Sequence, residues 1–333
     1  MSAGRDEVLA LLRANGVIGA GGDWQLVQLA GGWSRHTHRL TDAVSGRSFI
    51  VRVRPPGALL DTDLEREYRV YAAVAAAGVP VPAVHALQNA PESALGGPYF
   101  VMDHAPGHSP LVWQAGDREA LEANWRGDRS VATDVVGALA AIHDIPVAEL
   151  GFLGPPLSFR EAVGRWRAVY DKSAMVADPV VEEAFEWVLA RDPGPVEPSL
   201  VHADFRIGNM LLHEQRVTAV IDWELAHLGD PLFDVGYAAM PYYAGKFVRA
   251  GSPLVGAFAE PEWFVAEYAR RRGIEVDPET VRTYTVQGTL SLIAIIGIGL
   301  RRFADGESTD PRMAWNRFVI PGLRQDMVRL MGW

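Results

Sequence analysis

The chain of 333 residues contains no cysteine. This absence excludes disulfide bonds, thiol nucleophiles and cysteine-ligated metal sites together, and it suits a reducing compartment. Residues 1–7 lead into a short amphipathic pattern, without the apolar core and small-residue cleavage site of a secretory signal. We therefore expect a cytoplasmic protein.

Positive charge is also scarce. The chain has 31 lysines and arginines against 41 acidic residues, for a net charge of -10, and no lysine- or arginine-rich run. Binding to a phosphate backbone requires a basic face, so we expect no nucleic-acid partner.

Uncharged runs of membrane-spanning length are nearly absent. One run, residues 283–300, approaches that length, but it contains Thr285, Gln287, Thr289 and Ser291 and is interrupted by three glycines. It predicts a buried helix and no membrane span. The hydrophobic content of 49% with 22% charged residues is typical of a globular protein, and a chain of this length is expected to form two lobes.

The first hundred residues have the patterns of a small sheet. Alternating or β-branched runs predict strands over residues 24–29, 36–40, 48–54, 81–87 and 98–103. Apolar residues at spacings of three and four predict a helix over residues 61–77, between the third and fourth strands, and a short helix precedes the first strand. Residues 1–103 are therefore expected to form one lobe, an antiparallel sheet with one packed helix.

Residues 104–333 are dominated by helical spacing. Helices are predicted over residues 131–143, 159–170, 180–191, 231–240, 261–272, 278–302 and 312–330. This segment is expected to form a larger, mainly helical lobe, which makes the whole an α+β fold.

Two short apolar runs in the helical part, residues 200–212 and 217–224, carry a cluster of polar residues. The spacing from His202 to Asp204 and Asn209, followed by Asp222 after a strand, matches a kinase catalytic loop and its metal-binding aspartate. Phosphoryl transfer needs a carboxylate that accepts the proton of the substrate hydroxyl, which is the role predicted for Asp204. Asn209 and Asp222 offer oxygen ligands for Mg²⁺. The alternative is a structural turn in which Asp204 and Asn209 bond their own backbone.

The residues around this cluster have supporting roles in this interpretation. His202 is expected to pack or hydrogen-bond within the loop, and Glu224 either joins the metal shell through water or has no role there. Asp230 and Pro231 are typical of a helix N-cap followed by the first helical residue. Asp234, in the first turn of that helix, is predicted to reach the backbone of the catalytic loop.

The segments 200–209 and 221–231, together with residues 66–69 and the strand order of the first hundred residues, resemble the aminoglycoside phosphotransferase (APH) family. The resemblance covers roughly residues 20 to 300. It is strongest to the branch associated with acyl-CoA dehydrogenases. It implies a bilobal protein-kinase-like fold, with a nucleotide-binding N-lobe over 1–103 and a C-lobe with the catalytic loops and substrate-binding helices over 104–333.

The resemblance also implies the parts of a nucleotide site. Gly31, Gly32 and Ser34 correspond to the loop that covers the phosphates, where glycines let backbone N–H groups approach closely. The family commonly has asparagine at the next position, where this chain has Arg35. Residues 102–105, which include Met102 and His104, correspond to the hinge whose backbone bonds adenine.

The lysine that kinases carry on the third strand has no counterpart here, because the first 171 residues contain no lysine. Arg52 stands at the matching position, and the resemblance implies an ion pair between Arg52 and Glu67 in the following helix. Glu65 is the less favoured partner. The alternative for Arg52 is a solvated strand residue.

The implied activity is transfer of the γ-phosphate of ATP, with GTP as the alternative nucleotide, to a hydroxyl of a small molecule in the presence of Mg²⁺. The related branch suggests a hydroxy acid or its acyl thioester as acceptor. Residues 281–333 carry seven arginines against four acidic residues, and this net charge of seven minus four, or +3, favours an anionic acceptor.

Two other functions remain open at this point. The chain could phosphorylate an antibiotic, an aminoglycoside or a macrolide, or it could be a catalytically silent nucleotide-binding regulatory module. The presence of all three of Asp204, Asn209 and Asp222 disfavours the silent module, because losing one of them is the simple signature of degeneration. The sequence does not indicate an oligomeric state.

Overall fold

The computed structural model describes residues 2–29, 35–60, 62–245 and 251–333. The chain divides into two compact units, Met1–Pro106 and Gly107–Trp333. The first is built on an antiparallel sheet and the second is mainly helical, so the predicted α+β class is confirmed.

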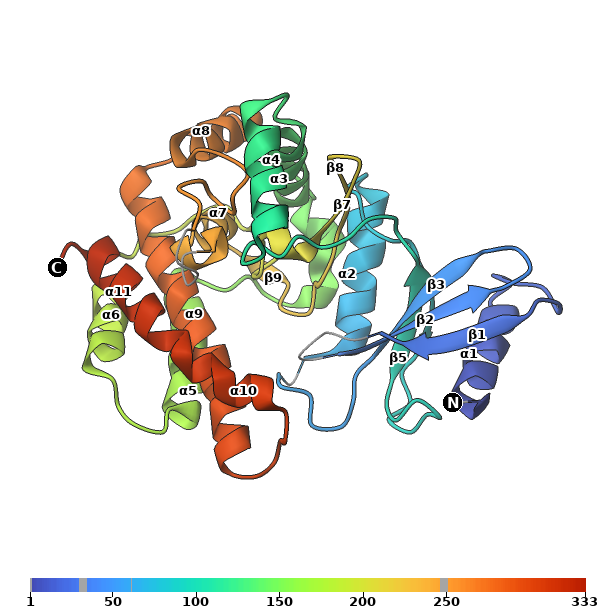
Figure 1. Ribbon diagram of the computed structural model, residues 1–333. Helices are drawn as coiled ribbons and strands as arrows, with labels where there is room; N and C mark the ends of the chain where they lie inside the picture. Colours follow the sequence, from blue (N-terminus) through green and yellow to red (C-terminus); the bar gives the residue numbers. More distant parts are fainter. Residues whose placement is uncertain (1, 30–34, 61, 246–250) are drawn as a thin grey trace. The chain divides into compact units, whose positions relative to one another are not determined.

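The described residues of the first unit form a five-stranded antiparallel sheet, with the strand order β1-β2-β3-β5-β4, and two helices (Figure 1). Each of the five strands predicted from the sequence is present, with ends that differ by a few residues. The elements are α1 (Ser2–Ala14), β1 (Trp24–Gln28), β2 (His36–Asp42), β3 (Ser48–Val53), α2 (Leu64–Ala76), β4 (Val84–Gln88) and β5 (Tyr99–Asp103).

The two faces of this sheet are covered by different helices. Side chains alternate along a strand, so Val51 and Tyr99 lie on one face, in a buried cluster with Val8 of α1. Arg52 and Phe100, which are paired in register, lie on the other face, where the Phe100 ring contacts Tyr71 of α2 at 5.7 Å. The sheet therefore directs Arg52 toward α2.

Helix α2 begins three residues later than its periodicity suggests. The Asp63 side chain accepts hydrogen bonds from the amides of Glu65 (2.9 Å) and Arg66 (3.3 Å), which satisfies donors of the first turn. This cap fixes the start of the helix, and hence the turn on which Glu67 lies.

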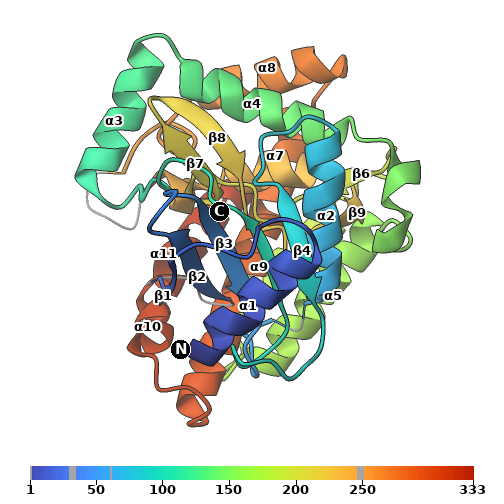
Figure 2. The same ribbon diagram turned by 90° about the vertical axis from the view of Figure 1, so that its right-hand side faces the viewer.

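The second unit packs its helices around one long central helix. α9 (Pro278–Ala304) contacts α5 (Phe159–Ser173), α6 (Pro179–Leu189), α7 (Leu232–Ala238) and α11 (Ile320–Met331) (Figures 1 and 2). Apolar side chains of these helices form a single core. The other α-helices among the described residues of this unit are α3 (Ala115–Arg126), α4 (Ser130–His143), α8 (Pro261–Arg272) and α10 (Pro311–Trp315). The strands are β6 (Ser199–Val201), β7 (Met210–His213), β8 (Arg216–Val220) and β9 (His227–Gly229).

One helix prediction fails and one helix was missed, both for physical reasons. The single helix expected over 312–330 is wrong, because the chain forms α10, a short 3₁₀ turn and then α11. Pro321 cannot donate an intrahelical hydrogen bond and therefore belongs to the first turn of a new helix. Helix α3 was not predicted, since it buries only Leu121, Asn124 and Trp125 and so shows little apolar periodicity.

Helix α9 is long and apolar enough to cross a membrane, but 78% of its most apolar window is buried inside the protein. The prediction of a buried helix is therefore confirmed. Two of its buried hydroxyls bond within the helix: those of Thr283 and Thr289 donate to carbonyls one turn earlier, at 2.9 and 2.8 Å. Helix α7 approaches so closely that a Cβ added at Gly236 would lie 2.5 Å from the Cβ of Tyr284.

Candidate active site

The catalytic segment runs from the end of β6 into a hairpin. Residues 202–206 lead into a 3₁₀ turn, Ile207–Asn209, and then into β7, which pairs with β8. The Ile221 amide donates to the Asn209 carbonyl at 2.9 Å, just beyond the last ladder pair. Because the hairpin returns the chain to its starting point, Asn209 and Asp222 lie at the same end of the two strands.

Asp204 is held by side chains on both of its carboxylate oxygens. Asn209 Nδ2 donates to Oδ2 at 2.5 Å and also to the Asp204 carbonyl at 2.9 Å. Arg206 Nε donates to Oδ1 at 3.1 Å. The amide orientation of Asn209 leaves its Oδ1 without a hydrogen bond from the described residues. The structure thus brings Asp204 and Asn209 together.

The backbone around Asp204 is fixed by His202 and Asp234. The buried His202 ring accepts from the Asp204 amide at Nδ1 (3.2 Å) and donates from Nε2 to the Ile221 carbonyl (3.1 Å), so it supports the loop as predicted. The Asp234 carboxylate accepts from the amides of His202 (2.7 Å) and Ala203 (2.8 Å). Ala203 has φ +67°, a left-handed conformation that costs free energy and that these hydrogen bonds offset.

Asp234 belongs to a fully buried polar chain. His143 contacts Asp234 Oδ2 through Nε2 at 3.1 Å and the Tyr268 hydroxyl through Nδ1 at 2.8 Å. Burial by itself would raise the pKa of Asp234, but the hydrogen bond and charge of His143 and the His202 amide hold the pKa below its ordinary value. The ionised carboxylate is therefore the form that binds the catalytic loop.

Asp222 and the segment after it adopt a constrained path. Asp222 has φ +73°, a left-handed conformation that aspartate tolerates better than most residues. Further on, Asp230 accepts from the Leu232 amide at 2.8 Å, but α7 begins one residue later than predicted, so the N-cap position falls on Pro231 and the prediction of Asp230 as N-cap is wrong. The Tyr284 hydroxyl also donates to Asp230, and burial raises the pKa of this carboxyl.

In the first unit, Glu67 lies between two arginines. Its Oε1 is 3.1 Å from Arg52 Nη2, and its Oε2 is 3.3 Å from Arg35 Nε; all three side chains are buried. The predicted ion pair of Arg52 and Glu67 is thus present, and Arg52 is not a solvated residue. Arg35 also donates to Thr62 at 2.5 Å. Glu65 is exposed and instead accepts from Asn89.

The other predicted nucleotide-binding residues are placed as follows. Met102 is buried in β5, and His104 follows the end of that strand, where burial lowers the pKa of its imidazole. Gly31, Gly32 and Ser34 lie outside the described residues.

Arg206 is a residue whose importance the sequence pattern did not reveal. Besides contacting Asp204, its guanidinium lies 5.4 Å from the centre of the Tyr243 ring, and the Tyr243 and Tyr237 hydroxyls are hydrogen-bonded at 2.7 Å. Burial would lower the pKa of Arg206, but the adjacent Asp204 carboxylate raises it above its ordinary value. The arginine is therefore a fixed positive charge beside the predicted base.

The net positive charge of residues 281–333 does not form an open basic surface. Six of the seven arginines form ion pairs with nearby carboxylates: Arg282 with Glu279, Arg301 with Asp305, Arg302 with Glu307, Arg312 with Asp310, Arg324 with Asp178, and Arg329 with Asp326. These pairs neutralise the regional charge, which therefore does not indicate an anionic acceptor.

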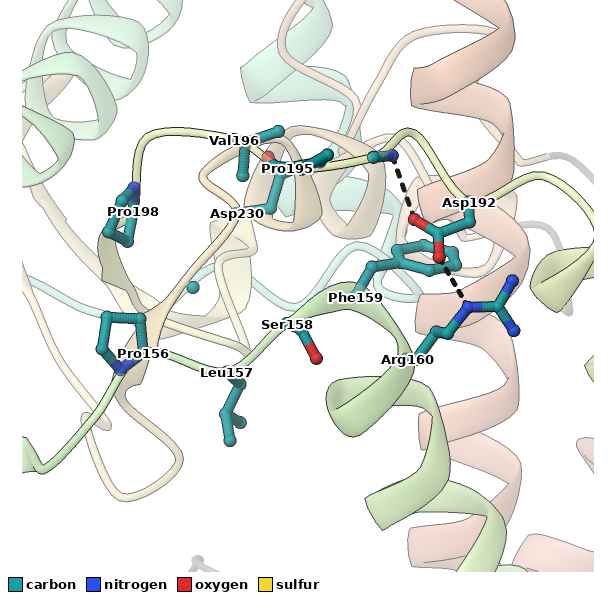
Figure 3. A pocket seen from close by; sticks show the side chains of 12 residues that line it. Pro156, Leu157, Ser158, Phe159, Arg160, Asp192, Pro195, Val196, Pro198 and Asp230 are labelled. Carbon is teal, nitrogen blue, oxygen red and sulfur yellow. Dashed lines mark hydrogen bonds and ion pairs between the residues drawn. The ribbon is translucent and has the colours of Figure 1, made fainter.

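A separate cavity of about 410 Å³ opens beside the start of α5 (Figure 3). Prolines and apolar side chains line much of it, and an ion pair of Arg160 Nε with Asp192 Oδ2 at 2.8 Å borders it. Gly229 and Asp230, which precede α7, also line it. Of the predicted catalytic, nucleotide and metal residues that the structure describes, none lines this cavity.

Comparison with known proteins agrees with this geometry. The family model described as "Phosphotransferase enzyme family", APH, matches residues 25–274. "Acyl-CoA dehydrogenase family member 10" of Mus musculus is 33% identical over 250 residues, which cover 72% of this chain and 22% of the mouse protein. The chain thus spans about a fifth of that relative's length.

Solved structures share the fold. A putative aminoglycoside phosphotransferase from Ralstonia eutropha superposes with a TM-score of 0.75 at 22% identity, covering 98% of this chain and 97% of that one. A mutant of aminoglycoside phosphotransferase APH(4)-Ia, in complex with ADP and hygromycin B, gives a TM-score of 0.61 at 19% identity, covering 98% of both chains. The two units are thus the N- and C-terminal parts of a bilobal protein-kinase-like fold. With three quarters of its length matched by the family model, the chain belongs to the APH family of phosphotransferase enzymes.

Proposed function

We propose that this chain transfers the γ-phosphate of ATP to a hydroxyl group of a small molecule, and that the acceptor is a hydroxy acid or its acyl thioester. The observation that carries the proposal is the arrangement around Asp204. A carboxylate bonded to Asn209 lies on a loop whose backbone is held by a second, buried carboxylate, Asp234. Phosphoryl transfer requires a base held in a fixed position beside the substrate hydroxyl, and Asp204 is held in this way.

Asp204 acts as the base in this proposal. It orients the acceptor hydroxyl and takes its proton as the oxygen attacks the γ-phosphorus. Only 19% of its side-chain surface is exposed, so the carboxylate is open to a substrate but largely shielded from water. The hydrogen bonds of the His202 ring and the Asp234 carboxylate keep the base in place and do not take part in the proton transfer.

Asn209 and Asp222 would hold Mg²⁺. The free Oδ1 of Asn209 and the carboxylate of Asp222 are the hard oxygen ligands that this cation prefers, and both lie at the same end of the hairpin. Among the described residues, no group of three histidine, aspartate or glutamate side chains could hold a metal ion by itself, so phosphate and water oxygens would complete the coordination. When bound, the cation neutralises charge that develops on the phosphates.

The first unit would bind the nucleotide. Arg52, fixed by Glu67, supplies a positive charge for the phosphates, in the place of the usual lysine. The backbone of residues near Met102 and His104 bonds the adenine, and Gly31, Gly32 and Ser34 cover the phosphates. Binding of ADP by a protein with this fold supports a nucleotide site in general, and ATP in place of GTP is part of the proposal.

The name of the mouse relative is the support for an acyl-type acceptor. Hygromycin B is bound by a protein that shares the fold at 19% identity, which does not favour an antibiotic as acceptor here. We therefore place hydroxy acids and their thioesters before aminoglycosides and macrolides. We also propose that the protein acts in the cytoplasm.

The test is an acceptor screen with matched variants. Purified protein with Mg²⁺ and ATP or GTP is incubated with hydroxy acids, their thioesters, sugars, aminoglycosides and macrolides, and phosphorylated product is detected by mass spectrometry. Asp204→Asn should keep nucleotide affinity and lose nearly all turnover, whereas Asp222→Ala should also weaken Mg²⁺-nucleotide binding. Asp171→Asn, an exposed carboxylate on α5, is the control. Full activity of Asp204→Asn, or nucleotide binding without transfer to any acceptor, would refute the proposal.

A further inference from the structure

The predicted base has two distinct sides. On one side, Asn209 donates to Asp204 Oδ2; on the other, Arg206 donates to Asp204 Oδ1. Asn209 belongs to the proposed metal and nucleotide side. Arg206 lies on the side of Tyr243, whose ring its guanidinium contacts. An acceptor hydroxyl that reaches Asp204 from the tyrosine side therefore meets Arg206 first.

Arg206 is held in a defined position. Its Nη1 lies so close to Gly208 that any Cβ at residue 208 would collide with it, and the Gly208 carbonyl is itself fixed by the hydroxyl of Ser109. With the Tyr243 ring on another side and Asp204 at its Nε, the guanidinium has little freedom to move. Such a rigid fork is suited to recognising a planar group.

The donors of Arg206 are only partly used. Among the described residues, its hydrogen bond to Asp204 engages Nε, and no hydrogen bond or ion pair engages Nη1 or Nη2. A quarter of its side-chain surface is exposed, so these nitrogens are open to a ligand. A guanidinium carries five N–H donors, and a largely buried one with most of them unused is typical of a group awaiting an oxygen-bearing partner.

We propose that Arg206 determines acceptor specificity by binding an acyl oxygen of the acceptor, a carboxylate or a thioester carbonyl, while the hydroxyl of the same molecule contacts Asp204. This inference rests on the proposed function and goes beyond it by assigning the residue that selects the acceptor. A fixed cation next to the base also disfavours polycationic acceptors such as aminoglycosides.

The contact between Arg206 and Asp204 limits the distance between the two recognised groups. With hydrogen bonds of ordinary length to each residue, the hydroxyl and acyl oxygens of the acceptor lie roughly 4–6 Å apart. A hydroxyl on the third or fourth carbon of an acyl chain fits this separation. A hydroxyl on the second carbon is too close, and one far along a chain is too distant.

The test compares acceptors that differ only in the acyl group. We would measure kcat/KM for 3- and 4-hydroxypentanoate, for their pantetheine thioesters and for the matching 1,3- and 1,4-pentanediols. In the wild type, the acid or the thioester should have a higher kcat/KM than the diol. Whichever of the two is preferred shows whether the acyl oxygen bound by Arg206 belongs to a carboxylate or to a thioester. In Arg206→Gln the preference should fall about 10- to 100-fold, mainly through KM, with the diols little affected. Arg206→Lys should restore part of it.

Three controls make the outcome decisive. Arg126→Gln removes an exposed arginine and should leave the preference unchanged. Gly208→Ala should reduce the preference, because its Cβ collides with Nη1 of Arg206 and forces the guanidinium out of its position. Circular dichroism establishes that each variant is folded.

Two results would overturn the inference. One is an acyl-to-diol preference that is unchanged in folded Arg206→Gln. The other is an equal loss of kcat for every acceptor and for water, which would mean that Arg206 acts on the transferring phosphate. If the wild type phosphorylates nothing, the proposed function fails. The role of Arg206 can then still be tested by calorimetric titration of 4-hydroxypentanoate into protein with Mg²⁺ and AMP-PNP. Binding lost in Arg206→Gln supports the role of Arg206, and absence of binding to the wild type refutes it.

Discussion

The buried carboxylate of Glu67 offers the sharpest test of how the first unit is held together. We consider Glu67→Gln, which keeps the shape of the side chain and removes its charge. Glu67 is 1% exposed and has Arg52 at 3.1 Å and Arg35 at 3.3 Å. At an effective dielectric constant of about 20, each attraction is about 5 kcal/mol before the cost of desolvation.

The net effect is smaller than the sum of these attractions, because both arginines also lost hydration on folding. Removing one partner from a buried ion pair typically costs about 3–5 kcal/mol, and we expect Glu67→Gln to lower the free energy of unfolding by this amount. For a protein stable by about 5–15 kcal/mol, this is a large fraction. The loss should be local, so hydrogen exchange should accelerate most in peptides from β3 and α2.

Glu65→Gln is the matched control, since Glu65 is exposed on the same helix and its loss should cost less than about 0.5 kcal/mol. Urea unfolding and hydrogen exchange by mass spectrometry are the assays. A double-mutant cycle with Arg52→Met isolates the ion pair. Equal effects of Glu67→Gln and Glu65→Gln, or a coupling energy near zero in the cycle, would refute the reasoning.

Three further predictions concern the second unit, and urea unfolding tests each of them. Asp234→Asn should cost about 2–4 kcal/mol, because the carboxylate accepts two backbone amides, whereas exposed Asp171→Asn should cost under about 0.5 kcal/mol; equal costs would contradict this. The pKa of Asp234 is lower in the folded than in the unfolded protein, so its ionised carboxylate stabilises the fold above about pH 4, and this stabilisation is lost as the pH falls further. The free energies of unfolding of Asp234→Asn and Asp171→Asn should therefore converge in acid. Gly236→Ala should destabilise by about 1–3 kcal/mol through collision with α9. Gly164 lies in open space on α5, so Gly164→Ala is the control and should stabilise the protein by about 0.5–1 kcal/mol. If Gly236→Ala is as stable as the wild type, the prediction is wrong and α7 can move away from α9.

Local patterns in the sequence predicted several features correctly. Alternation and apolar spacing located the five strands of the first unit and most helices of the second, because each pattern reflects the period of a single element. The spacing of His202, Asp204 and Asn209 could be recognised because all three lie on one short segment. The partner of Arg52 was predicted by resemblance to the kinase ion pair, and Glu67 lies at that position.

The failures have physical causes of their own. Helix α3 buries too few apolar side chains to leave a periodic signal. The charge of residues 281–333 suggested a basic surface, yet local ion pairs such as that of Arg301 with Asp305 neutralise it, and composition cannot show such pairing. Arg206 went unassigned because its role depends on the direction of its side chain, which Gly208 and Tyr243 determine.

The sequence by itself determined the residue types, the periods of the elements and the short-range spacing of the catalytic segment. Only the tertiary structure decided which distant groups complete the site. Asp234 bonds the backbone of residues 202 and 203, some thirty positions earlier, and His143 reaches Asp234 from a different helix. Such contacts depend on how helices and strands pack in three dimensions, and sequence separation carries no record of that packing.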